Sequence, residues 1–211
     1  TLDQHKTSTV TEANVLRDLY EGLVVYDTEA QVIPGVAESW EVSEDGTIYT
    51  FTLRDTAKWS NGDPVIAGDF VFSFNRIMDP ATGAKYANIL YPIKGAEAIN
   101  KGEEGELGVT ALDDRTLQIT LERPTPYFLE LLTHQTGLPL HPASVEAHGD
   151  AFVQPANMVS NGAYRLESFT PNDKIVVTKN PEFHGADEVA IEQVEFIPFE
   201  DLANCARRFE A

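Results

Sequence analysis

Residues 47–54 alternate between large apolar and hydroxyl side chains. Tyr49, Phe51 and Leu53 are separated by threonines, and the turn Ser43-Glu44-Asp45-Gly46 leads into them. Successive side chains of a β-strand point to opposite faces, so this alternation predicts a strand with one buried face and one exposed face. A strand of this kind requires a sheet around it.

A second hairpin is predicted further along the chain. Residues 109–112 and 115–122 flank the turn Asp113-Asp114, and Leu117, Ile119 and Leu121 share one face of the second strand. Further strands are predicted over residues 23–26, 163–167, 174–179 and 190–197, with turn-forming residues between them. Short strands joined by tight turns favour mixed or mostly antiparallel sheet.

Helical spacing of apolar residues marks four other segments. Residues 11–20 and 70–78 carry such stripes, and a short apolar helix is predicted after Pro126, with that proline in its first turn. Residues 200–211 form another amphipathic segment, while residues 139–159 are predicted to be a long connection. Together these elements predict an α+β fold.

The chain is strongly acidic, with 34 Asp and Glu against 15 Lys and Arg, a formal charge of −19. Binding to phosphate backbones or anionic lipid needs clustered basic residues, and the sequence contains no such run. We therefore expect no nucleic-acid partner. Its apolar runs are far shorter than the roughly 18 residues that suggest a membrane-spanning helix.

The sequence shows no catalytic or metal centre. It lacks a Gly-x-Ser-x-Gly elbow, and helical spacing predicts that Cys205 is a small core residue. His134, His141 and His148 recur every seven residues, but glycine and prolines between them break any helix that would align them, so we expect no metal site. The adjacent carboxylates at 113–114 and 200–201 are expected to be structural. A binding protein without a cofactor is favoured over an enzyme.

Several strings, in this order and spacing, closely resemble the oligopeptide- and dipeptide-binding proteins of bacterial ABC importers, the family 5 extracellular solute-binding proteins. The resemblance runs through the whole chain. The strings are TLDQHK at 1–6, LYEGL at 19–23, PGVAESW at 34–40, SEDGTIYTFTLR at 43–54, KWSNGDPV at 58–65 and SNGAY at 160–164.

The resemblance implies a two-lobed receptor that closes on an extended peptide. It implies a lobe of the type II periplasmic-binding-protein class, with a mixed sheet and a small inserted α/β subdomain. Residues 1–42 would begin lobe I, residues 43–158 would form the subdomain and residues 159–211 would return to lobe I. Family members continue into a second lobe that holds the acidic group for the peptide amino terminus. We therefore expect this chain to be the first lobe only and to bind peptide weakly by itself.

The resemblance also implies which residues contact the ligand. The segment at 21–23 is similar to one that offers backbone hydrogen bonds to a peptide, and a glycine at 22 fits because it lets another backbone approach closely. An aromatic side chain and the re-entry from the subdomain are expected near the cleft as well. The implied ligand-binding residues are Glu21, Gly22, Leu23, Tyr86, Asn161, Gly162 and Phe209.

Two positions depart from the family pattern. Gln4 stands where proline is usual, and Ile66 stands where a threonine commonly caps the following helix. Loss of the hydroxyl cap would cost about 1 kcal/mol unless Asp69 or a shifted helix start substitutes for it.

The resemblance implies a periplasmic or lipid-anchored receptor that captures oligopeptides and delivers them to an ABC transporter permease. We expect a monomer. Three alternatives remain open: a receptor of the same family for a nickel chelate, haem, sugar or opine; a peptide or glycan hydrolase; and a signalling or chaperone-like receptor that uses the fold without transport.

Overall fold

The computed structural model describes residues 1–198 and 205–207. Its longer helices are α1 (Val10–Leu19), α2 (Ala67–Met78), α3 (Ala96–Asn100), α4 (Phe128–Leu132) and α5 (Pro142–His148). Its strands are β1 (Val24–Tyr26), β2 (Val32–Pro34), β3 (Ala37–Val42), β4 (Ile48–Leu53), β5 (Val109–Ala111), β6 (Thr116–Thr120), β7 (Tyr164–Thr170), β8 (Lys174–Lys179) and β9 (Gln193–Phe196). Short 3₁₀ segments are η1 (Pro80–Thr82), η2 (Ala87–Leu90), η3 (Gln135–Gly137), η4 (Gly149–Val153) and η5 (Ala186–Glu188).

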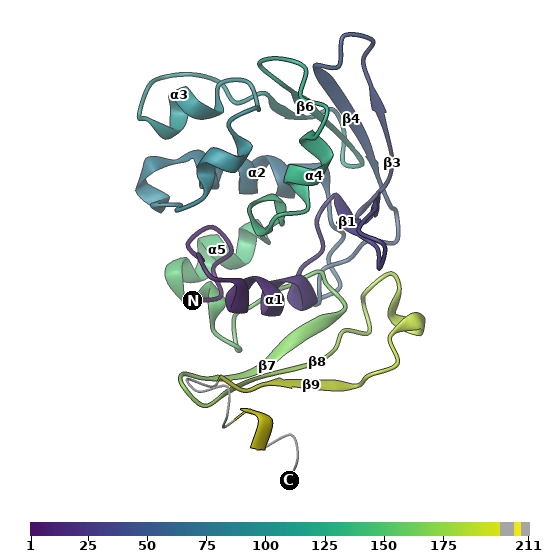
Figure 1. The fold of residues 1–211 in the computed structure, drawn as a ribbon, viewed down its shortest axis with the longest axis vertical. Helices are drawn as coiled ribbons and strands as arrows, with labels where there is room; N and C mark the ends of the chain where they lie inside the picture. The colour runs from purple at the N-terminus through teal and green to yellow at the C-terminus, as the bar shows by residue number, and fades with distance from the viewer. Residues whose placement is uncertain (199–204, 208–211) are drawn as a thin grey trace.

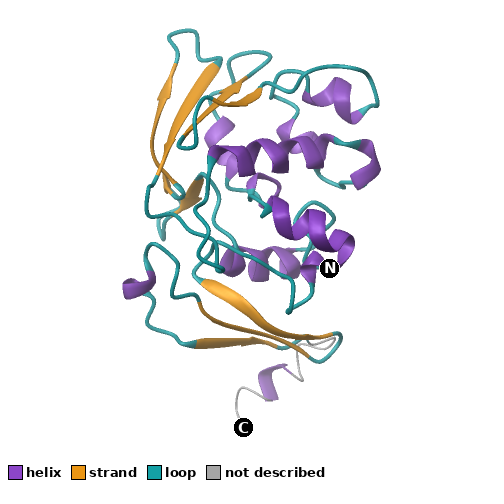
Figure 2. Ribbon diagram, turned by 180° about the vertical axis from the view of Figure 1, so that it is seen from behind, coloured by secondary structure: helices purple, strands orange, loops and turns teal. Residues whose placement is uncertain are grey.

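The predicted strand β4 and the predicted hairpin of β5 with β6 join in one antiparallel sheet with the order β3-β4-β6-β5, in which β3 was not predicted. Phe51 lies opposite Leu117 and Tyr49 lies opposite Ile119, so the apolar face is continuous across the centre of the sheet. Helix α2 contacts β5 and β6, and its Phe70, Phe74 and Ile77 are fully buried. Helices α2 to α5 lie to one side of this sheet (Figures 1 and 2). The alternation in β4 therefore has the covering layer that it requires.

The C-terminal strands form a second antiparallel sheet, ordered β7-β8-β9. Helix α1 lies against it and contacts β7, and the short ladder of β1 with β2 lies between the two larger sheets (Figure 1). All strand pairs within the described residues are antiparallel. The α+β prediction is confirmed.

Two local expectations were wrong. Residues 139–159 contain α5, with Pro142 in its first turn and the His141 ring capping it by accepting from Ser144 N. Pro126 lies outside the short helix that it was expected to begin, because a turn in which Phe128 N donates to Thr125 O delays the helix to Phe128. Both errors come from side-chain and turn hydrogen bonds that apolar periodicity does not report.

Asp69 supplies part of the missing cap of α2. Its carboxylate accepts from the backbone N–H of Ile66 at 3.0 Å and from the indole N–H of Trp59 at 2.9 Å. Burial raises the pKa of Asp69, although both hydrogen bonds oppose that rise. The carboxylate thus satisfies two donors at the start of α2, in the way that the sequence allowed.

The N-terminal segment is buried against residues of the predicted subdomain. Both carboxylate oxygens of Asp3 accept from Arg76 of α2, at 3.1 and 2.7 Å, and Arg76 also donates to His5 Nδ1 at 2.8 Å. The Gln4 side chain donates to Pro139 O at 2.9 Å. These contacts hold the first residues of the predicted lobe I against α2.

One hydrophobic core extends through both predicted units, from Leu2 and Leu16 to Phe70 and Leu140. The β3–β4 hairpin also spans the predicted boundary between residues 42 and 43, because its two strands pair from Ala37 with Leu53 to Val42 with Tyr49. The division of the chain into lobe I and subdomain stays a prediction, and the two parts share their packing.

The buried imidazole of His5 makes stability depend on pH. Burial, and then the positive charge of Arg76, lower its pKa from 6.5 to about 3. The unfolded chain therefore binds a proton at pH 4–6 that the folded chain does not. Acidification from pH 6.5 toward pH 4 should lower the free energy of unfolding, by up to about 1.4 kcal/mol per pH unit from this group.

His5→Asn removes the titration and keeps an acceptor for Arg76. Urea unfolding at several pH values should show a shallower decline for this variant than for the parent chain. Burial also lowers the pKa of His134, but that contribution is common to both proteins. Burial alone would raise the pKa of Asp3, yet Arg76 outweighs it and lowers that pKa from 3.8. The stabilisation from Asp3 therefore declines as pH falls toward 3.8 and below, and this contribution too is present in both proteins. Equal slopes for the two proteins would contradict the assignment to His5.

Candidate ligand-binding site

The segment Glu21-Gly22-Leu23 connects the end of α1 to β1. The carbonyls of Gly22 and Leu23 accept hydrogen bonds from backbone N–H groups of residues 35–37, where β2 turns into β3. Val36 N donates to Gly22 O at 2.9 Å, and the N–H groups of Gly35 and Ala37 both donate to Leu23 O at 3.1 Å. The glycine that this packing requires is Gly35, because a Cβ there would lie 2.5 Å from Gly22 O. A Cβ at Gly22 would meet nothing nearer than 3.4 Å.

Asn161 closes a two-point contact with the backbone of Glu21. Glu21 N donates to Asn161 Oδ1 at 3.1 Å, and Asn161 Nδ2 donates to Glu21 O at 2.9 Å. The Asn161 side chain is buried, so it acts as a short replacement for a neighbouring strand. It joins two segments, 140 positions apart in the sequence, that the resemblance implies lie near the ligand.

These contacts fix the direction of the two following N–H groups. A trans peptide is planar, and its N–H points opposite to its C=O. Glu21 O faces Asn161, so Gly22 N–H points away from Asn161; Gly22 O faces Val36, so Leu23 N–H points away from the β2–β3 turn. Neither N–H meets an acceptor in the part of the chain that the structure describes. Buried backbone donors are almost always paired, so these two N–H groups are exceptions within the described residues.

Gly162 packs directly on the end of α1. Its N–H donates to Leu19 O at 2.8 Å, and its carbonyl accepts from the Asn180 side chain at 2.9 Å. A Cβ at Gly162 would lie 2.6 Å from backbone atoms of residues 18–20, closer than real Cβ contacts. Gly162 therefore has a packing reason to be glycine, and it positions Asn161 beside Glu21.

Gly162→Ala should destabilise the chain by about 1–3 kcal/mol, because the neighbouring atoms are backbone and have little room to move. Gly68→Ala is the matched control. Gly68 lies in the first turn of α2, where a Cβ would meet only the Ile66 side chain at 3.6 Å, and alanine favours a helix. Urea unfolding of both variants checks the comparison; equal stabilities would contradict the close-packing argument.

Tyr86 is linked to the segment only indirectly. Its ring, 38% exposed, packs edge-on against the His134 ring with centroids 5.7 Å apart. In sequence, His134 lies between Leu132 and Gly137, whose carbonyl oxygens would lie 3.5 and 3.7 Å from a Cβ placed on Gly22. Burial, and then the charge of Arg17, lower the pKa of His134, so a neutral ring faces Tyr86 at pH 7. The structure thus brings Glu21, Asn161 and Gly162 into contact with one another, with Tyr86 as an outlying member.

The chain is similar in sequence to a known family of proteins. The family model for the middle region of bacterial extracellular solute-binding proteins, family 5, matches residues 31–211. The chain belongs to this family. It is 43% identical to the periplasmic oligopeptide-binding protein OppA of Salmonella typhimurium over 214 residues, which cover 100% of this chain and 39% of the relative.

One relative has a similar structure in complex with a peptide, and the name of another indicates a different kind of ligand. Haemophilus influenzae OppA in complex with RPPGFSPFR superimposes with a TM-score of 0.97 at 44% identity, over 100% of this chain and 42% of that one. A probable deoxycholate-binding periplasmic protein of Escherichia coli, YgiS, is 40% identical over 100% of this chain and 40% of its own length. The chain therefore spans about two fifths of these family members.

Some predicted residues fall elsewhere. Phe209 lies outside the described residues. Cys205 is exposed, contrary to the prediction that it is a core residue, because helical spacing predicts an apolar face but not the element that would cover it. Among the described residues, none of the helices has the length and apolar character needed to cross a membrane.

The three spaced histidines have separate local roles. His134 contacts Tyr86 and Thr136, His141 caps α5 and contacts Asp63 at 3.0 Å, and His148 lies exposed at the end of α5. Asp113 accepts from Arg115 N and from the Thr116 hydroxyl, as a turn residue does. The contacts of Asp113 agree with the structural role expected of it, and residues 200–201 lie outside the described residues.

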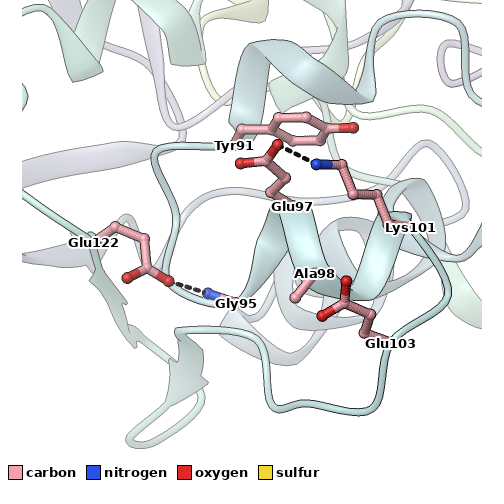
Figure 3. Close-up of a pocket in the computed structure, with 7 residues that line it drawn as sticks. All are labelled: Tyr91, Gly95, Glu97, Ala98, Lys101, Glu103 and Glu122. Carbon is pink, nitrogen blue, oxygen red and sulfur yellow. Dashed lines mark hydrogen bonds and ion pairs between the residues drawn. The ribbon is translucent and has the colours of Figure 1, made fainter.

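A hollow of about 300 Å³ lies beside α3, far from the β7–β9 sheet (Figures 1 and 3). Glu97 pairs with Lys101 at 2.6 Å, and Glu122 accepts from Gly95 N at 2.8 Å (Figure 3). Two of its carboxylates are thus engaged in local contacts. This hollow contributes nothing to the segment at 21–23.

Sequence reasoning missed three residues around the segment. Gly35 was read only as part of a motif, Asn180 only as part of a turn, and His184 was not considered. His184 Nε2 lies 2.8 Å from Glu21 Oε2 although 163 positions separate the two residues. An Asn-Pro turn followed by a lone histidine gives no indication of that contact, which depends on the fold of the whole lobe.

Proposed function

We propose that this chain forms part of the substrate-binding component of an ABC peptide importer and that it holds peptides in an extended conformation. The observation that carries the proposal is the pair of N–H groups of Gly22 and Leu23, which point away from Asn161 and from the β2–β3 turn and have no acceptors in the described residues. An extended peptide offers backbone carbonyls at regular spacing, which is how added strands bind. Backbone pairing tolerates any side chain, as a receptor for varied peptides requires.

The other residues have supporting roles in this proposal. Asn161 and Gly162 position the segment, and Tyr86 offers an exposed aromatic edge near it. Phe209 is proposed to lie near the cleft on the resemblance alone. A second lobe, outside these residues, would supply the opposite wall and the partner for the peptide amino group.

The wider proposal follows the names of the family members. They are called binding proteins, and several are called periplasmic, which supports a non-enzymatic receptor outside the cytoplasmic membrane, free or lipid-anchored. Delivery to a membrane permease and a monomeric state belong to the same proposal. The division into residues 1–42, 43–158 and 159–211 is retained as its structural frame.

A thermal-shift titration tests the proposal, with a pool of two- to five-residue peptides added to residues 1–211 and to the full product of the gene. A ligand that binds only the folded state raises the melting temperature, by an amount equivalent to about 2.7 kcal/mol at 100 times Kd. We expect a clear shift for the full gene product and a small one for residues 1–211 alone. A shift with deoxycholate, a nickel chelate, haem or a sugar, and none with peptides, would contradict the peptide proposal.

A further inference from the structure

Glu21 is held at its side chain as well as at its backbone. His184 Nε2 donates to Glu21 Oε2 at 2.8 Å, and the two side chains are only 18% and 11% exposed. The contact thus joins the loop after β8 to the segment at 21–23. Neither the family resemblance nor the proposed function assigns a role to His184.

The loop that carries His184 is built on the same glycine that positions Asn161. The Asn180 side chain donates to Gly162 O, and Asn180 N donates to Ala163 O, both at 2.9 Å. Phe183 N closes the turn on Asn180 O at 3.2 Å, and the Phe183 and His184 rings lie 4.4 Å apart. His184 is therefore placed by residues 162–163 and by its aromatic neighbour, independently of Glu21.

The position of the Glu21 carboxylate matters because it belongs to the residue just before Gly22. A carboxylate on a short tether is a strong acceptor for nearby backbone N–H groups, and such local hydrogen bonds compete with longer-range ones. Gly22 and Leu23 offer two N–H groups without acceptors in the described residues. A free Glu21 carboxylate would compete with a peptide carbonyl for them.

We propose that His184 is a positioning residue for peptide binding: it holds the Glu21 carboxylate away from the N–H groups of Gly22 and Leu23 and so keeps them available to the ligand. The inference rests on the proposed function for its consequence, since the ligand is taken to be a peptide. The competition itself is a property of the ligand-free protein and can be measured there.

Binding of trialanine to the full gene product gives the first test, by calorimetry. His184→Ala should weaken binding about fivefold or more. His184→Gln should restore most of it, because the glutamine amide can donate in place of Nε2. Glu21→Ala in the His184→Ala background should also recover most of the loss, because the competing acceptor is gone. His148→Ala, an exposed histidine on α5, is the matched control and should bind like the parent protein.

A merely structural role predicts another pattern, in which the double variant binds as weakly as His184→Ala or more weakly. That result, or unchanged binding by His184→Ala, would overturn the proposal.

Amide hydrogen exchange without ligand gives the second test. His184→Ala should slow exchange at Gly22 or Leu23, because the released carboxylate takes up one of these N–H groups, and the double variant should return it to the parent rate. Equal or faster exchange in His184→Ala would overturn the inference even if peptides bind. Failure of the parent protein to bind any peptide of the pool would instead count against the proposed function, and the exchange result would still decide the role of His184.

Discussion

The two hydrogen bonds between the Asn161 side chain and the Glu21 backbone are the contact on which the proposed ligand-binding surface depends. One side-chain amide satisfies both the N–H and the C=O of Glu21, which would otherwise need a neighbouring strand. Because the next peptide unit is planar, this contact also sets the direction of Gly22 N–H. Val36 does the same for Leu23 N–H through the carbonyl of Gly22. The N–H and C=O of Glu21 and the carbonyls of Gly22 and Leu23 are thus paired within the protein, and the N–H groups of Gly22 and Leu23 form the proposed binding edge.

The rest of the lobe keeps that edge in place. Gly162 and Gly35 allow the close backbone approaches, one against the end of α1 and the other against Gly22 O. The ion pair of Asp3 with Arg76 joins the N-terminal segment to α2. The parts predicted as lobe I and subdomain therefore share buried polar contacts as well as one hydrophobic core. A partly buried pair of this kind is costly to break, because removal of one partner leaves the other charge without compensation.

Local sequence patterns predicted most of the elements, and they failed where distant contacts decide. The alternation around Phe51 and the stripe of Phe70 and Phe74 identified β4 and α2 because each element must bury one face. The cap of α2 was also foreseen, since Asp69 lies one turn from Ile66. Helix α5 was missed because a histidine ring caps it. The contact of His184 with Glu21 could not be predicted, because no periodicity links residues that meet only after both sheets have formed. The family resemblance pointed to the segment at 21–23 as a ligand contact. The hydrogen bonds of Asn161 and Val36 give a physical reason for this proposal, because they set the directions of the N–H groups of Gly22 and Leu23.

The central claim is that the N–H groups of Gly22 and Leu23 receive the carbonyls of a bound peptide. The most direct measurement is the amide spectrum of the full, isotope-labelled gene product, recorded with and without a saturating peptide that raises its melting temperature. The account predicts large downfield shifts and strong protection from exchange at Gly22 and Leu23, with small changes at the α3 hollow. Saturation by peptide with both amides unshifted and still exchanging would contradict it.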